Sequence, residues 1–174
     1  SNLISAGGYV VDNSLRFNDD SSDNLTFTPS SAGNRKTNTT SLWLKRSNLG
    51  TMYFNAWYEY GAGKDHINIS FQNGDQLTVE NYTGTSLDWK LRSNQVFRDV
   101  SAWYHIVISI DTTQSTSTDR AKMYVNGNEI TSFSTSSYPA LNSDTAISQA
   151  QTTRLGVSVG GTYYDGYMSE VCLI

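Results

Sequence analysis

Residues 103–111, Trp-Tyr-His-Ile-Val-Ile-Ser-Ile-Asp, form the stretch that decides the fold class. Large apolar side chains recur there at every second position, which is the period of a β-strand. One face of such a strand would carry Tyr104, Ile106, Ile108 and Ile110. Leaving this row in water would forfeit roughly 1.5–3 kcal/mol per large side chain, so the row must pack against another layer. We therefore predict a layered β protein.

The composition favours strands and turns and excludes several kinds of partner. Ser, Thr and Asn are abundant and good helix formers are scarce. The net charge is −4 without a basic stripe, so we predict no nucleic-acid partner. No apolar run approaches the roughly 18 residues that span a membrane, so we predict no membrane insertion. The single cysteine, Cys172, excludes an internal disulfide, and we predict that it is buried.

The length of 174 residues fits one domain with a substantial core. Residues 1–14 read as an N-terminal arm and residues 15–174 as a single domain. Roughly ten to thirteen short strands are expected, at spacings typical of a sandwich or jelly roll. The clearest of them cover residues 15–17, 25–27, 39–45, 52–60, 67–72, 77–79, 87–92, 121–125, 155–159 and 167–174.

One hairpin follows from turn chemistry. Asn126-Gly127 is the dipeptide preferred in a two-residue type I′ turn, because both positions need positive φ. Such a loop pairs Val125 with Asn128 and places Met123 and Ile130 on the same face. The agreement between turn and apolar pattern predicts a β-hairpin here.

Four segments, in this order, resemble the laminin-G-like branch of the concanavalin A-like lectin/glucanase superfamily. They are residues 41–45 (Ser-Leu-Trp-Leu-Lys), 103–107 (Trp-Tyr-His-Ile-Val), 123–127 (Met-Tyr-Val-Asn-Gly) and 165–171 (Asp-Gly-Tyr-Met-Ser-Glu-Val). More narrowly, residues 14–19, 31–36 and 96–103 resemble the versions of this domain in tail-fibre-like proteins of marine bacteriophages.

The resemblance implies an all-β fold, a two-sheet antiparallel jelly-roll sandwich. It also implies glycan binding on the concave sheet or at the loop rim, sometimes with a structural calcium ion. The phage-like segments imply an extracellular or virion-surface location, with a cell-surface glycan or polysaccharide and other virion proteins as partners, and they leave room for an oligomer.

The segment 52–60 carries the first candidate sugar site. Its alternation places Tyr53, Asn55, Trp57 and Glu59 on one side. Sugars present C–H faces that stack on aromatic rings, and hydroxyl pairs that bond to amide or carboxylate groups. The alternative is that Trp57 belongs to the core and Asn55 to a sheet edge.

Adjacent tyrosines form a second candidate for carbohydrate binding. Tyr163 and Tyr164 stand beside Gly160-Gly161 and Asp165. Tyrosines in a Gly-rich loop suit recognition, but they also pack beneath loops, and both interpretations stay open.

Calcium is the one cofactor that the resemblance suggests. Relatives commonly carry an aspartate just before the Glu-Val pair, where this chain has Ser169, and a hydroxyl is a poorer calcium ligand than a carboxylate. The oxygen-rich alternatives are Asp19, Asp20 and Asp165.

Three classes of function remain: a lectin-like module, a structural virion module and a glycoside hydrolase. Hydrolases of the superfamily use a Glu-x-Asp-x-Glu array whose two catalytic carboxylates stand about 5–5.5 Å apart. The four glutamates, Glu59, Glu80, Glu129 and Glu170, do not form such an array. We therefore predict a non-catalytic carbohydrate-binding module, with a decoration or oligomerisation module as the alternative.

Overall fold

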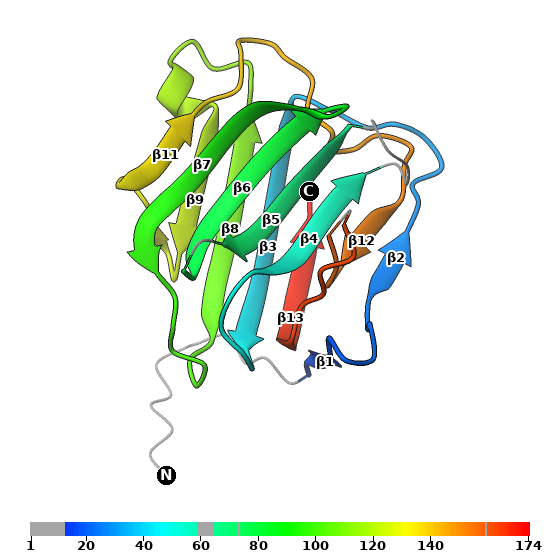
Figure 1. Cartoon of the computed structure of the whole chain (residues 1–174). Coiled ribbons are helices and arrows are strands. Elements are labelled where there is room, and N and C mark those ends of the chain that lie inside the picture. Colours follow the sequence, from blue (N-terminus) through cyan, green and yellow to red (C-terminus); the bar gives the residue numbers. More distant parts are fainter. Residues whose placement is uncertain (1–12, 59–64, 73, 159) are drawn as a thin grey trace.

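The computed structural model describes residues 13–58, 65–72, 74–158 and 160–174, with residues 55–58 described by their backbone alone (Figure 1). Its elements are β1 (Leu15–Phe17), β2 (Leu25–Phe27), β3 (Thr37–Arg46), β4 (Met52–Tyr58), β5 (His66–Gln72), β6 (Gln76–Thr83), β7 (Ser86–Val96), β8 (Tyr104–Asp111), the 3₁₀ helix η1 (Ser117–Asp119), β9 (Ala121–Val125), β10 (Asn128–Glu129), β11 (Phe133–Ser137), β12 (Thr153–Leu155) and β13 (Gly166–Leu173). No helix in these ranges is long and apolar enough to cross a membrane.

The strands form two antiparallel sheets packed face to face, which confirms the predicted sandwich. The six-stranded sheet has the order β1-β13-β3-β8-β9-β10, and the seven-stranded sheet has the order β11-β7-β6-β5-β4-β12-β2. Figure 1 shows the seven-stranded sheet in front of the six-stranded one. The predicted domain begins at β1, whereas residues 1–12 of the predicted arm lie outside the described residues.

The stretch 103–111 supplies β8, which lies between β3 and β9 in the six-stranded sheet. Ile106, Ile108 and Ile110 are at most 2% exposed and face the core, as their alternation predicts. Tyr104 packs against the same core at its margin. Trp103 precedes the strand and is 37% exposed.

The Asn126-Gly127 hairpin is confirmed in register and in turn geometry. Val125 pairs with Asn128, and the φ angles are 51° at Asn126 and 79° at Gly127. The Ile130 N–H donates to the Met123 carbonyl over 2.8 Å, so these two residues meet as predicted.

A buried ion pair joins the two sheets. Arg46 ends β3 in one sheet, and Asp75 lies in the turn between β5 and β6 of the other. The Arg46 side chain is fully buried, and its Nη2 lies 2.7 Å from Asp75 Oδ1. Its Nη1 donates to the Phe97 carbonyl over 2.6 Å, and its guanidinium lies 4.5 Å from the centre of the Phe71 ring.

The C-terminal strand corrects the prediction for Cys172, which is exposed. The register between β13 and β3 shifts between Ser169 and Cys172, and Glu170 adopts a φ of 50°. The expectation rested on the apolar run around Cys172 and on the usual burial of free cysteines, and this irregularity shows that the run is not uniformly buried.

Candidate functional site

The outer face of the seven-stranded sheet, called the front face below, is polar. Strand pairing aligns its residues in rows that cross the sheet. The central row occupies the register positions Thr26, Arg154, Ala56, Asn68, Glu80, Lys90 and Ser137. The neighbouring row occupies Tyr53, Ser70, Thr78, Arg92 and Thr135.

A hydrogen-bonded network fixes the middle of the front face. The Gln72 amide nitrogen lies 2.9 Å from Ser70 Oγ, 3.0 Å from Glu80 Oε1 and 3.3 Å from the Tyr53 hydroxyl. Lys90 Nζ lies 2.6 Å from the other oxygen of the Glu80 carboxylate. Both oxygens of this carboxylate therefore have partners, and the network holds neighbouring side chains in one arrangement.

Aromatic rings border this network. The rings of His66 and Tyr82 stack with their centroids 4.5 Å apart and their planes 10° apart. Burial, and after it the nearby Glu80 carboxylate, raises the pKa of the Tyr53 and Tyr82 hydroxyls above the ordinary tyrosine value. Both phenols therefore stay protonated at neutral pH and are available as hydrogen-bond donors.

Exposure divides the front face into a buried floor and longer side chains that reach solvent. Asn68, Ser70, Gln72, Thr78 and Glu80 are at most 8% exposed. The half-buried residues beside them are Tyr53, His66, Tyr82, Lys90, Arg92 and Arg154. A ligand on this face would thus meet rings, a hydroxyl and cations above a fixed polar floor.

The first predicted sugar site lies only in part on described side chains. Tyr53 pairs with Ser70 and belongs to the front face, but the register of β4 shifts between Tyr53 and Asn55. After the shift, Asn55 and Trp57 pair with Ile69 and Ile67, so an unbroken alternation from Tyr53 onward was wrong. The side chains of Asn55 and Trp57, and all of Glu59, lie outside the described residues, and their role stays a prediction.

The second predicted sugar site is wrong for Tyr164. This residue is fully buried, its ring lies edge-on to Phe17 and Phe54, and its hydroxyl donates to the Lys45 carbonyl over 2.8 Å. Burial raises the pKa of this hydroxyl. Tyr163 is half-buried, and its backbone forms an isolated antiparallel β-bridge with Val157.

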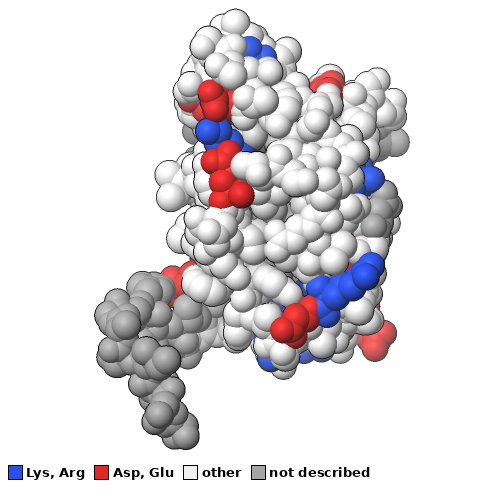
Figure 2. Space-filling model, turned by 90° about the vertical axis from the view of Figure 1, so that its left-hand side faces the viewer, with Lys and Arg blue, Asp and Glu red and all other residues white. Residues whose placement is uncertain are grey.

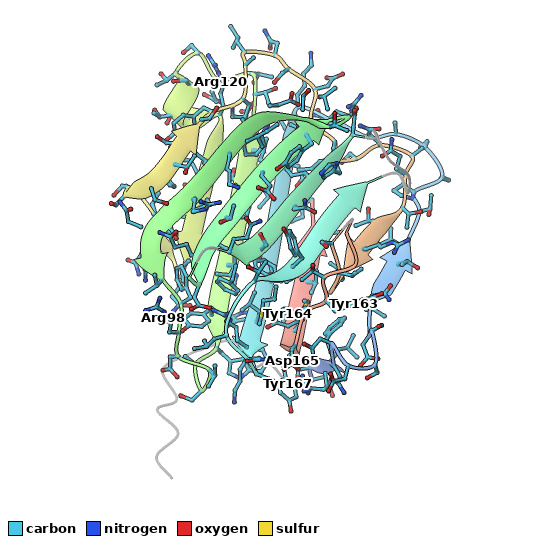
Figure 3. All side chains as sticks on the ribbon, in the orientation of Figure 1. Arg98, Arg120, Tyr163, Tyr164, Asp165 and Tyr167 are labelled. Atoms are coloured by element: carbon cyan, nitrogen blue, oxygen red, sulfur yellow. The ribbon has the colours of Figure 1, made fainter. Side chains whose placement is uncertain are left out.

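The two tyrosines are also remote from the front-face network. Figure 3 shows Tyr163, Tyr164, Asp165 and Tyr167 near the end of the sandwich at which β13 begins. The structure therefore does not bring the predicted Tyr163 site together with the network around Glu80.

The structure does not bring the three predicted calcium ligands together in one group. Asp165 Oδ1 lies 2.6 Å from Arg16 Nη1, so a cationic side chain already occupies this carboxylate. Asp19 and Asp20 are exposed residues of the turn between β1 and β2. Within the described residues, no group of three Asp, Glu, His or Cys side chains is placed to hold a metal ion. The Ser169 hydroxyl donates instead to the Asn13 carbonyl.

Sequence reasoning missed most of the front face, although its signal was present. Asn68, Ser70 and Gln72 alternate with the buried Ile67, Ile69 and Phe71 in β5. Lys90 and Arg92 alternate in the same way with the buried Trp89 and Leu91 in β7. The alternation marks each residue as outward-facing, but only strand order reveals that these outward residues share one surface.

Charged groups elsewhere are scattered. Figure 2 shows the side of the sandwich that lies on the left in Figure 1, where most of the surface is uncharged. Some of its Lys and Arg side chains lie beside Asp and Glu, and others stand apart from them. Between η1 and β9, Lys122 Nζ lies 2.9 Å from Asp119 Oδ1.

Comparison with known families and structures gives a consistent result. The family described as the concanavalin A-like lectin/glucanases superfamily matches residues 19–173. No curated protein matches the sequence. Among solved structures, domains LG4-5 of the mouse laminin α1 chain align with a TM-score of 0.66 and 15% identity, over 99% of this chain and 44% of the laminin chain.

Two further structures carry related domains. The CBM40 of the Ruminococcus gnavus IT-sialidase, bound to α2,3 sialyllactose, has a TM-score of 0.55 and 14% identity, over 86% of this chain and 91% of that chain. Tailspike protein 2 of Escherichia coli O157:H7 bacteriophage CAB120 has a TM-score of 0.55 and 15% identity, over 91% of this chain and 22% of that chain. At these identities the likeness demonstrates a shared fold.

Proposed function

Because the chain belongs to the concanavalin A-like lectin/glucanases superfamily, we propose that it is a non-catalytic carbohydrate-binding module whose ligand lies on the front face. The observation that carries this proposal is the fixed polar floor around Gln72 and Glu80 beside the stacked rings of His66 and Tyr82. The sugar-bound CBM40 supports it at the level of the fold.

The chemistry of the front face suits a glycan. Aromatic rings contact the C–H faces of a sugar, and phenol, amide and ammonium groups bond to its hydroxyls. Tyr53 accepts a hydrogen bond from Gln72 and keeps its own proton for a ligand. Because the network already fixes these side chains, binding loses little side-chain conformational entropy.

The arrangement around Glu80 supports a non-catalytic role. In the two described rows of the front face, Glu80 is the one carboxylate, and both of its oxygens have partners. Glycoside hydrolysis by the usual mechanism needs two carboxyl groups flanking the scissile bond. Glu80 thus organises the floor of the proposed site.

The proposed setting is extracellular, in a virion adhesion or tail-fibre protein that recognises a host-surface glycan alongside other virion proteins. The phage-like segments of the sequence and the shared fold of a phage tailspike domain support this setting.

One observation favours a second candidate, a structural module that packs against another virion protein. A groove of about 400 Å³ opens between the edges of the two sheets, lined partly by Leu15, Leu25 and Val171. Leu15, Leu25 and Phe27 are 45–55% exposed, and such apolar patches commonly mark contact surfaces.

A glycan array with host polysaccharides separates the two candidates. We expect saturable binding that falls about tenfold in Tyr82→Ala, since a lost ring contact of about 1.4 kcal/mol corresponds to that factor. Tyr124→Ala, on the outer face of the six-stranded sheet, is the matched control and keeps full affinity. Trp57→Ala tests the sequence-based assignment of Trp57 to the sugar site, which predicts a loss of binding. Silence across the array, together with self-association in sedimentation, would favour the structural module.

A further inference from the structure

The front face carries positive charge on a chain that is negative overall. Its two rows contain three cations, Lys90, Arg92 and Arg154, and one carboxylate, Glu80. The formal charge of these rows is therefore +2, whereas the whole chain carries −4. A local excess of this sign raises the concentration of anionic ligands at the surface.

The cations stand at the two sides of the polar floor. Arg154 lies on β12, and Lys90 and Arg92 lie on β7, with β4, β5 and β6 between them. Four strand spacings of about 4.8 Å separate the backbones of β12 and β7, which gives roughly 19 Å. A small inorganic anion cannot contact both sides, whereas an oligosaccharide chain laid across the strands can.

The two arginines differ from the lysine in the geometry of their N–H donors. Lys90 lies 2.6 Å from Glu80 and forms part of the polar floor. Arg92 and Arg154 are half-buried on the same face, where a guanidinium meets a ligand with part of its hydration already removed. Arginine binds carboxylate and sulfate groups through paired N–H donors in a fixed geometry.

We propose that the front face selects acidic glycans, meaning oligosaccharides that carry carboxylate or sulfate groups, and that Arg92 and Arg154 contact those groups. This inference rests on the proposed carbohydrate-binding function and names its ligand class. The half-buried Tyr53, His66 and Tyr82 above the floor contact the sugar, and the two arginines contact its charged groups.

The test uses the full chain and three ligand pairs that differ in charge: oligogalacturonate and its methyl ester, dextran sulfate and dextran, and α2,3-sialyllactose and lactose. We expect the charged member of at least one pair to bind at least tenfold more tightly in titration calorimetry. Arg154→Gln and Arg92→Gln should each weaken that binding about tenfold, because a hydrogen bond to a charged group is worth about 1.5–3 kcal/mol. Lys122→Gln, on the other sheet, removes the same charge and should leave it unchanged.

The outcomes separate this inference from the function on which it rests. Equal affinity within every pair, or full affinity in both arginine variants, overturns the preference for acidic glycans. Binding of only neutral glycans on the array overturns it as well and leaves the carbohydrate-binding function standing. Absence of binding to every glycan on the array overturns the proposed carbohydrate-binding function itself. Among the charged ligands, the pair that responds distinguishes carboxylate from sulfate recognition.

Discussion

Replacing Asp75 with asparagine should lower the free energy of unfolding at neutral pH by about 3–5 kcal/mol, because Arg46 would remain as a buried cation without its counter-ion. The Arg46 side chain is fully buried, and that of Asp75 is 7% exposed. The carboxylate also accepts hydrogen bonds from the Gly50 N–H over 2.8 Å and from Arg98 over 3.1 Å. Urea denaturation at pH 7 measures the loss.

The same pair makes stability depend on pH. Burial alone would raise the pKa of Asp75, but the hydrogen bonds from Gly50, Arg46 and Arg98 outweigh it and lower the pKa below the ordinary value. The stabilisation is therefore present above the unfolded pKa of about 3.9 and is lost as the pH falls through the folded pKa. The gap between wild type and Asp75→Asn should close on acidification.

A control variant distinguishes the effect of the Arg46–Asp75 pair from the general effect of acid on stability. Asp99 also has a lowered pKa, caused mainly by hydrogen bonds from Ser101, but it is exposed. Asp99→Asn should change stability far less than Asp75→Asn at neutral pH. A gap between wild type and Asp75→Asn that stays constant from neutral to acid pH would contradict the linkage argument.

Replacing Tyr164 with alanine should lower the free energy of unfolding by about 3–5 kcal/mol, the usual cost of removing a fully buried aromatic ring. The ring of Tyr164 contacts Phe17 and Phe54, and its hydroxyl satisfies the Lys45 carbonyl. Tyr163→Ala is the matched control, since its ring is half-buried, and it should cost much less. Chemical denaturation of both variants measures the difference, and equal losses would show that Tyr164 is not the core residue described above.

Much of the fold could be predicted from local patterns because several strands combine a two-residue alternation with a turn signal at one end. The isoleucines of β8 and the Asn126-Gly127 hairpin illustrate this, since period and turn chemistry act within a few residues. Irregular register is not encoded so locally. The shift near Asn55 broke the predicted alternation of β4, and a second shift lies near Glu170 in β13.

The candidate site was harder to predict because it is assembled from distant strands. Arg154, Asn68, Glu80 and Lys90 belong to four strands, and their common row follows from strand order. The adjacent Tyr163 and Tyr164 were prominent in the sequence, yet one of them serves the core. A polar residue on an alternating strand therefore indicates a binding site less well than the residues that pair with it on neighbouring strands.

The central claim, that a glycan binds on the front face, is tested most directly by titrating the ¹⁵N-labelled chain with the strongest ligand from the array and following backbone amide shifts. The account predicts saturable shifts that gather on β5, β6, β7 and β12, with Asn68, Glu80, Lys90 and Arg154 among the most affected residues. Shifts confined to the loop around Tyr163 or to the outer face of the six-stranded sheet would contradict it.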